Sequence, residues 1–251
     1  MQHLLLHQQS CSEIFVYETD ELYGERGAFR VLQFASKAVQ GAMDMNRPER
    51  IILEYPRAML YLLQRHVPDP GRVFIIGHGT GTIASHLSRS DVIVAEIDPV
   101  VAEISRNFFG YTGDSVRIGD GRSLLEEEKP NSFDGIIVDA FSEQGTPGHL
   151  TSLGFFQLAA ERLDREGILL LNLFGRGADD AWIAALTATL REVMEYVRVF
   201  SLPAGQPHEP RNMLIAGSRK PIQYQAHGMA GFVEVEPPAG YIIYDPISID
   251  R

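Results

Sequence analysis

Short apolar runs alternate with segments of helical periodicity over most of the chain, and this alternation predicts an α/β fold. From residue 72 onward the apolar runs are rich in β-branched residues and lack the polar alternation of a half-exposed strand. Such runs are typical of a parallel sheet that helices cover on both faces. Strands are therefore expected at 73–76, 92–95, 116–118, 135–138, 168–171, 197–200 and 213–216. Helices are expected at 80–87, 99–109, 150–163 and 179–194.

The N-terminal part of the chain predicts a separate β element. Apolar and polar positions alternate between Glu13 and Phe34, and Gly24 and Gly27 lie where a hairpin turn belongs. After a break at 46–48, helical spacing runs from 51 to 63 and ends near Pro68. We therefore expect a β element over 1–47, an α/β domain over 48–220, and a C-terminal tail over 221–251 to which the sequence assigns no role.

Composition narrows the class of protein. A chain of 251 residues with 45% apolar and 22% charged residues is typical of one globular domain with a small extension. A net charge of −11 opposes binding to a phosphate backbone, so we expect no nucleic acid partner. No apolar run reaches the ~18 residues of a membrane-spanning helix, so we expect a soluble protein with no membrane partner. The single cysteine, Cys11, allows no intrachain disulfide and no CxxC pair, which favours a cytoplasmic location and predicts no metal.

A glycine-rich turn follows the first strand of the predicted domain. Gly77, Gly79 and Gly81 stand at GxGxG spacing before a predicted helix. Glycines there allow a sharp turn and the close approach of a ligand, and the start of the helix presents backbone amides. A dinucleotide fingerprint would place its third glycine at Thr82, so the spacing disfavours NAD. The alternative at this point is a plain tight turn.

Carboxylates follow the next two strands. Glu96 ends the second strand, where its side chain could accept hydrogen bonds from both hydroxyls of a ribose. Asp98 precedes Pro99 and is interpreted as a helix N-cap instead. Asp120 and Gly121 follow the third strand, where the carboxylate is placed to bind an adenine amino group or, alternatively, to form a turn.

These motifs together resemble the spermidine synthase (polyamine aminopropyltransferase) family. The resemblance rests on the glycine turn, Glu-Ile-Asp at 96–98, Gly-Asp-Gly at 119–121 and Val-Asp-Ala-Phe at 138–141, and it extends over roughly 13–217. It implies a Rossmann-like, seven-stranded methyltransferase-type sheet with an N-terminal β extension, a homodimer, decarboxylated S-adenosylmethionine as co-substrate and a small-molecule amine as acceptor. The residues expected to bind the co-substrate are Gln40, Gly77, Gly79, Gly81, Glu96, Asp120 and Gly121.

Three departures from the family pattern leave the reaction open. In the family's D-[ST]-x-D-P motif, Asp139 matches the first Asp, but Ser142 replaces the second, which helps to hold the acceptor amine. Thr80 replaces a family Asp that helps to bind the donor's aminopropyl amine. Arg57 replaces the Glu of the family's Tyr-His-Glu and puts a cation toward the acceptor, unless it pairs with Glu54 or binds a carboxylate of the donor. Methyl transfer from S-adenosylmethionine is therefore a rival hypothesis, and a non-catalytic nucleoside-binding protein is a third.

In both transfer reactions a nucleophile attacks a carbon that is bonded to the sulfonium sulfur, and the sulfur leaves. An alkylamine, with a pKa near ~10, is inert while it is protonated, so the site must remove a proton from it. We predict that Asp139 accepts this proton and that Tyr55 assists by hydrogen bonding. Tyr55 and Ser142 are the predicted substrate-side residues. The structural alternatives are a capping role for Asp139 and simple packing for Tyr55.

Overall fold

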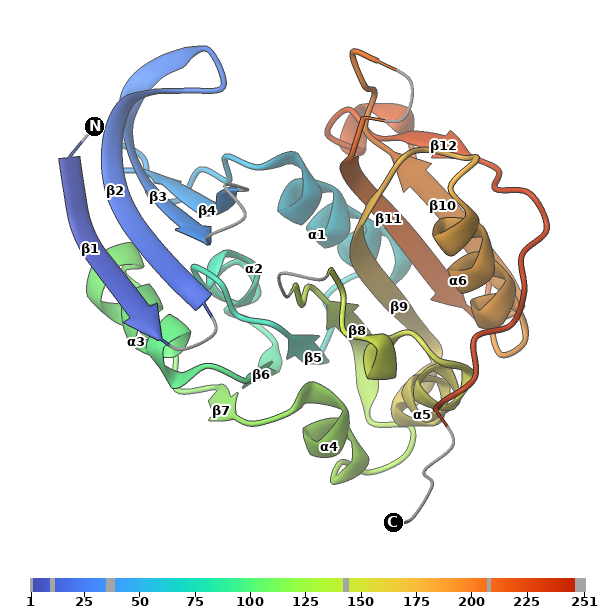
Figure 1. Ribbon diagram of the computed structural model, residues 1–251. Coiled ribbons are helices and arrows are strands. Elements are labelled where there is room, and N and C mark those ends of the chain that lie inside the picture. Colours follow the sequence, from blue (N-terminus) through green and yellow to red (C-terminus); the bar gives the residue numbers. More distant parts are fainter. Residues whose placement is uncertain (1, 10–11, 35–38, 142–144, 207–208, 247–251) are drawn as a thin grey trace.

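The computed structural model describes residues 2–9, 12–34, 39–141, 145–206 and 209–246; Cys11 and Ser142 lie outside these ranges. Within them the chain forms two sheets (Figure 1). A four-stranded antiparallel sheet at the N-terminus faces an eight-stranded, largely parallel sheet that helices cover on both faces. The predicted α/β fold class is confirmed.

The small sheet consists of β1 (Gln2–Gln9), β2 (Ser12–Leu22), β3 (Glu25–Phe34) and β4 (Val39–Asp44), in that order. Tyr23 and Gly24 join β2 to β3, and both have positive φ (50° and 78°), as a tight two-residue hairpin turn requires. Ile14 and Val16 of β2 and Val31 of β3 are buried. The predicted hairpin is therefore the centre of this sheet, and β1 and β4 extend it on either side.

The large sheet has the order β12-β10-β11-β9-β8-β5-β6-β7. The strands from β9 to β7 are parallel, while β11, β10 and β12 add antiparallel to β9. All seven predicted strands of this sheet are present; the three-residue β12 adds an eighth within the described ranges. Their bounds are β5 (Arg72–Ile76), β6 (Asp91–Glu96), β7 (Val116–Ile118), β8 (Phe133–Val138), β9 (Leu163–Gly175), β10 (Tyr196–Ser201), β11 (Arg211–Ser218) and β12 (Val233–Val235).

The helices follow the predicted pattern with local differences. The first begins at Glu54, because Ile51 forms a β-bridge with Met43 instead of a helical turn. The helix expected at 80–87 is shorter, because Gly81 adopts a left-handed conformation (φ 79°) just before it. The helices are α1 (Glu54–His66), α2 (Thr82–Ser85), α3 (Pro99–Phe109), α4 (Gly121–Glu126), α5 (Leu153–Arg162) and α6 (Ala181–Arg191), with 3-10 turns η1 (Gly148–Leu150) and η2 (Ala226–Gly228).

The core lies on both faces of the large sheet. Val73 and Ile75 of β5 pack with Leu62 of α1, whereas Phe74 of the same strand packs with Phe155 of α5. Because both faces of the central strands are buried, the ends of these strands are held in fixed positions. Among the described residues, no helix is long and apolar enough to cross a bilayer.

Helix α3 connects the two sheets. Its residues Ile104 and Phe109 pack with Ile14 and Leu32 of the small sheet. The guanidinium of Arg30 in β3 donates a hydrogen bond of 2.7 Å to the backbone oxygen of residue 108 in α3. These contacts with α3 fix the small sheet beside the carboxyl end of β6, where α3 begins.

Candidate active site

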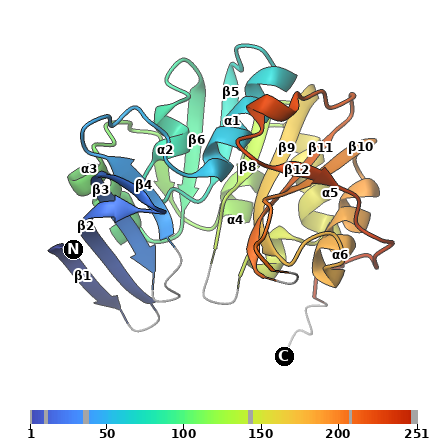
Figure 2. The same cartoon turned by 90° about the horizontal axis from the view of Figure 1, so that it is seen from above.

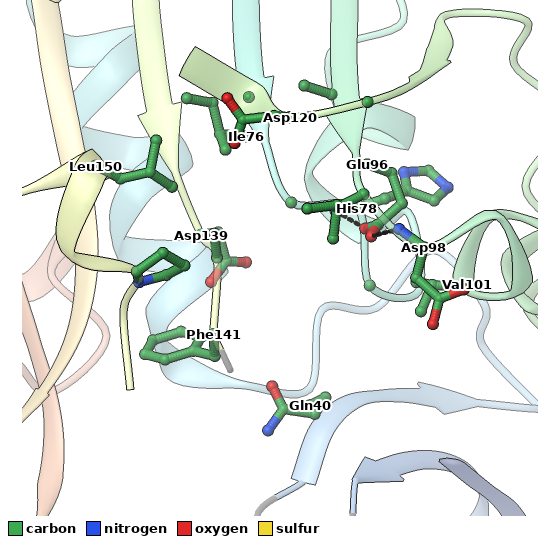
Figure 3. Close-up of a pocket in the computed structure, with 18 of the residues that line it drawn as sticks. Gln40, Ile76, His78, Glu96, Asp98, Val101, Asp120, Asp139, Phe141 and Leu150 are labelled. Carbon is green, nitrogen blue, oxygen red and sulfur yellow. Dashed lines mark hydrogen bonds between the residues drawn. The ribbon is translucent and has the colours of Figure 1, made fainter. Parts of the chain in front are cut away.

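The carboxyl ends of β5, β6, β7 and β8 surround a cavity of about 350 Å³ (Figure 3). The strands lie in register there: the amide of Asp139 after β8 bonds to the oxygen of Ile76 in β5 (2.8 Å), and the amide of Gly77 bonds to the oxygen of Ala95 in β6 (2.8 Å). Residues that follow different strands therefore meet at one edge, which is where open α/β sheets bind ligands. Of the predicted site residues, this cavity is lined by Gln40, Tyr55, Gly77, Gly79, Glu96, Asp120, Gly121 and Asp139.

The glycine turn forms the floor of the cavity between β5 and α2. At Gly77 the backbone has φ 95°, and a Cβ atom would lie 2.0 Å from the backbone oxygen of Asp139. No larger residue fits there. Gly79 also has positive φ (54°), and Gly81 (φ 79°) packs against the ring of Tyr111. Gly81 does not line the cavity. It is the N-cap residue of α2.

Glu96 is buried, and its carboxylate is held by two backbone amides. The amide of His78 donates to Oε2 and the amide of Asp98 to Oε1, both at 2.9 Å (Figure 3). Burial raises the pKa of Glu96, and these hydrogen bonds offset part of the rise. Each oxygen keeps a second lone pair, so the anchored carboxylate can still accept two ribose hydroxyls. Asp98 caps α3 as predicted, accepting from the amide of Val100 (2.9 Å).

Asp120 has structural partners on both of its carboxylate oxygens. Oδ1 accepts from the amide of Ser123 at 2.9 Å, which caps α4, and Oδ2 lies 2.7 Å from Nε2 of His149. Burial raises the pKa of Asp120, but the bonds to Ser123 and His149 outweigh this effect and lower it. The alternative interpretation from sequence was a turn residue; in the structure Asp120 is the N-cap of α4. His149, which also lines the cavity, was not predicted.

The wall beside Glu96 is apolar. Ile97 is 72% exposed although it is a large hydrophobic residue, and Val101 lines the cavity next to it. An apolar surface of this kind beside a carboxylate can accommodate the flat face of an aromatic ring. Ile97 was not predicted either, because its position directly after β6 carried no chemical signal.

Asp139 is held by a row of side-chain amides. Its Oδ1 accepts from Nδ2 of Asn172 (2.9 Å), and Oδ1 of Asn172 accepts from Nδ2 of Asn212 (2.9 Å). The single hydroxyl proton of Tyr55 is shared between the Asp139 carboxylate and the backbone oxygen of Gln40, which lies 3.3 Å from the hydroxyl oxygen. Burial raises the pKa of Asp139 to about 6, against the lowering effect of these two donors. Sequence reasoning missed Asn172 and Asn212.

Tyr55 and Gln40 bring α1 and the small sheet to the cavity. The Tyr55 hydroxyl lies 3.3 Å from the backbone oxygen of Gln40. Burial, and next the nearby Asp139 carboxylate, raises the pKa of Tyr55 well above its ordinary value of 10. The phenol is therefore a neutral hydrogen-bond donor at physiological pH.

A second cavity, of about 480 Å³, adjoins the first. Gln40, Tyr55 and Phe141 line both cavities. The carboxylates of Glu54 and Glu209 line the second cavity, where Ser142 was expected to contribute; Ser142 lies outside the described residues.

Arg57 does not occupy the position that the sequence suggested. It is absent from the lining of both cavities, its Nε donates to the oxygen of Leu53 (3.2 Å), and its Nη2 lies 3.7 Å from Glu54. The structure therefore contains the alternative interpretation of Arg57, a pairing with Glu54, in which the side chain lines neither cavity. Among the described residues, no cluster of His, Cys, Asp and Glu has the arrangement of a metal site.

Comparison with known proteins decides the family. The sequence model of the spermine/spermidine synthase domain matches residues 54–204, which is more than half of the chain. The chain belongs to the spermine/spermidine synthase family. The resemblance noted from the glycine turn and the three carboxylate motifs is thereby confirmed.

Similar proteins from this family cover nearly the whole chain. The polyamine aminopropyltransferase of Vibrio vulnificus is 27% identical over 93% of this chain and 80% of its own length. The solved structure of a probable spermidine synthase from Corynebacterium glutamicum superposes with a TM-score of 0.83 at 19% identity, covering 98% of both chains. A spermidine synthase in complex with the transition-state analogue AdoDATO superposes with a TM-score of 0.67 at 18% identity, covering 91% of this chain and 83% of that chain. The two solved structures support the spermidine synthase fold.

Proposed function

We propose that this protein transfers the aminopropyl group of decarboxylated S-adenosylmethionine to the amine of a polyamine acceptor. The observation that carries the proposal is the Asp139 carboxylate, whose pKa of about 6 leaves it ionised near neutrality. It lies in the first cavity, of about 350 Å³, which we call the nucleoside cavity. Tyr55 and Phe141 line this cavity and also the second one. A base in this position can reach an amine that approaches the donor from the second cavity.

The reaction requires one displacement and one proton transfer. The lone pair of the acceptor nitrogen attacks the aminopropyl carbon next to the sulfonium, a C–N bond forms, and the C–S bond breaks with its electrons passing to sulfur. Methylthioadenosine leaves as a neutral thioether. The proton lost by the nitrogen passes to Asp139, which Asn172 and Tyr55 hold in place. Holding the two reactants in adjoining cavities supplies much of the rate.

The charges of the nucleoside cavity favour the decarboxylated donor. Its described lining contains the carboxylates of Glu96, Asp98, Asp120 and Asp139 and neither Lys nor Arg. Such a cavity suits a cation and offers no basic side chain to the carboxylate of ordinary S-adenosylmethionine. The second cavity is lined by two carboxylates, Glu54 and Glu209, and by one guanidinium, Arg211, so its lining keeps a net negative charge that suits an acceptor with a further ammonium group.

One observation favours methyl transfer from S-adenosylmethionine as a second candidate. Thr80 stands where the family has an Asp for the donor's amine; its hydroxyl lies 2.8 Å from that of Thr82, and its side chain fills the space next to Gly41. The turn therefore offers no carboxylate at this position. The third hypothesis, a binding protein without turnover, gains no support from the network that holds Asp139.

A product assay by mass spectrometry separates the three hypotheses. The purified protein is incubated separately with decarboxylated and ordinary S-adenosylmethionine in the presence of putrescine, spermidine and related amines. We expect methylthioadenosine and an extended polyamine from the first donor. S-adenosylhomocysteine from the second donor would establish methyl transfer instead, and neither product would favour the binding protein.

The variant Asp139→Asn tests the base. Loss of a general base lowers the rate by roughly 10²- to 10⁴-fold. We expect that loss without a loss of methylthioadenosine binding, which calorimetry measures. Undiminished turnover in the variant would remove Asp139 from the mechanism.

Assembly and location remain predictions. We propose a homodimer in the cytoplasm that acts without nucleic acid or membrane partners, on the basis of the family resemblance and the net charge of −11. Size-exclusion chromatography with light scattering tests the dimer, since a monomeric mass at micromolar concentration would contradict it.

A further inference from the structure

One wall of the nucleoside cavity is held by residues that do not themselves line the cavity. The wall is formed by η1 and Pro147 before it, with His149 and Leu150 lining the cavity. Figure 3 shows Leu150 on the opposite side of the cavity from Glu96. Arg122 of α4 donates from Nη1 to the backbone oxygen of His149 at 3.1 Å. The Arg122 guanidinium therefore supports this wall from α4, in addition to the contact between His149 and Asp120.

Asp245 fixes that guanidinium. Its Oδ1 lies 2.5 Å from Nη1 of Arg122 and accepts a hydrogen bond of 2.7 Å from the hydroxyl of Ser152, the residue that caps α5. The Arg122 side chain is only 23% exposed, so the pair is partly shielded from solvent. The Asp245 carboxylate thus binds Arg122 of α4, which bonds to η1, and Ser152, which caps α5.

Asp245 is itself fixed by a segment that we call the C-terminal strap, residues 236–246. It runs from β12 along α6 to α5 (Figures 1 and 2). The amide of Ile243 donates to the hydroxyl of Thr189 in α6 (2.9 Å), and the oxygen of Ile243 accepts from the amide of Leu153 in α5 (2.7 Å). At Gly240 a Cβ atom would lie 2.3 Å from the backbone oxygen of Ala184, so the strap lies directly against α6.

We propose that Asp245, acting through Arg122, is a positioning residue for the adenosine part of the donor. The inference rests on the proposed function and adds a determinant of donor affinity to it. The Asp139 network is built from β8, β9, β11 and α1, whereas the strap bonds to α4, α5 and α6. Weakening the strap is therefore expected to raise the KM for the donor and to leave kcat unchanged.

Calorimetry with 5′-methylthioadenosine tests the proposal without turnover. In Asp245→Asn and in Arg122→Gln we expect Kd to rise roughly threefold to tenfold, in line with the loss of one partly shielded, charge-assisted contact. The matched control is Glu236→Gln, which breaks an exposed ion pair of the same strap with Arg191 (2.7 Å) on α6. We expect this control to bind methylthioadenosine as the unchanged protein does.

A double-mutant cycle and a salt titration distinguish loss of the contact between Asp245 and Arg122 from general damage to the fold. The double variant Asp245→Asn, Arg122→Gln is expected to bind no more weakly than Arg122→Gln alone, because Asp245 acts through Arg122. Since methylthioadenosine is uncharged, weakening of its binding by salt in the unchanged protein reports the ion pair, and this salt dependence is expected to vanish in the double variant. Equal Kd values for Asp245→Asn and Glu236→Gln would overturn the proposal. Failure of the unchanged protein to bind methylthioadenosine would overturn the proposed function as well.

Discussion

Among the single residues of the site, Asp139 combines reactivity with a cost in stability. A base in water has to be both ionised and basic, and a pKa of about 6 meets both conditions near neutral pH. Burial sets this value, and the donors Asn172 and Tyr55 limit it. The acid limb of the rate profile is therefore expected near pH 6, not near the ordinary aspartate value.

The variant Asn172→Ala tests how the base is tuned. It removes a donor that favours the charged carboxylate, so the pKa of Asp139 rises and the acid limb of kcat/KM moves to higher pH. Asn212→Ala, whose side chain reaches Asp139 only through Asn172, serves as the control and should move the limb less. A limb that stays in place or moves to lower pH in Asn172→Ala would contradict this account.

Asp139→Asn is expected to stabilise the protein above pH 6. A carboxyl whose pKa is raised from 3.8 to about 6 by folding costs almost nothing below about pH 3, because it is protonated in both states. The cost grows as pH rises from about 3 to about 7 and is complete above. Partial exposure reduces its size to on the order of 1–2 kcal/mol. Thermal unfolding should give a higher Tm for the variant at pH 8 and nearly equal Tm values at about pH 3; a lower Tm at pH 8 would show that the amide does not fit.

Among the elements, the glycine turn after β5 tolerates the least change. Gly77→Ala combines a strained positive φ with a Cβ only 2.0 Å from the backbone of Asp139, so we expect a loss of about 3 kcal/mol or more and loss of nucleoside binding. The control is Gly24→Ala, which has φ 78° but open space around the new methyl group and should cost about 1 kcal/mol. Denaturant unfolding compares the two; equal losses would refute the steric part of the argument.

Elements defined by local signals could be predicted from the sequence. Helix α3 spans the predicted 99–109, because the Asp98 cap at its start and Gly110 (φ 70°) at its end are both local. Helix α4 was missed, since its six residues are too few to show a period. Gly77, Glu96 and Asp139 could be found because each follows a buried strand directly. Asn172 could not, because it lies 33 residues from Asp139 in sequence and reaches it only through the pairing of β8 with β9.

On the scale of the whole molecule, the two sheets are expected to unfold together. Ile104 of α3 packs in one cluster with Ile14 and Leu32 of the small sheet. Ile104→Ala should therefore lower stability by about 2–5 kcal/mol in a single shared transition. Differential scanning calorimetry can follow this. The appearance of a separate early transition for the small sheet would show that the two sheets fold independently.

The contact between the glycine turn and Asp139 has a thermodynamic consequence under the proposed function. A sulfonium donor that lies on the turn brings a positive charge close to a carboxyl that is about half protonated at pH 6, and that charge lowers its pKa. Binding of the donor should then release up to about half a proton per molecule at pH 6, which calorimetry in buffers of different ionisation enthalpy detects, whereas neutral methylthioadenosine should release none. The donor would thus prepare its own base, and an acceptor amine that arrives second would meet a carboxylate already free of its proton.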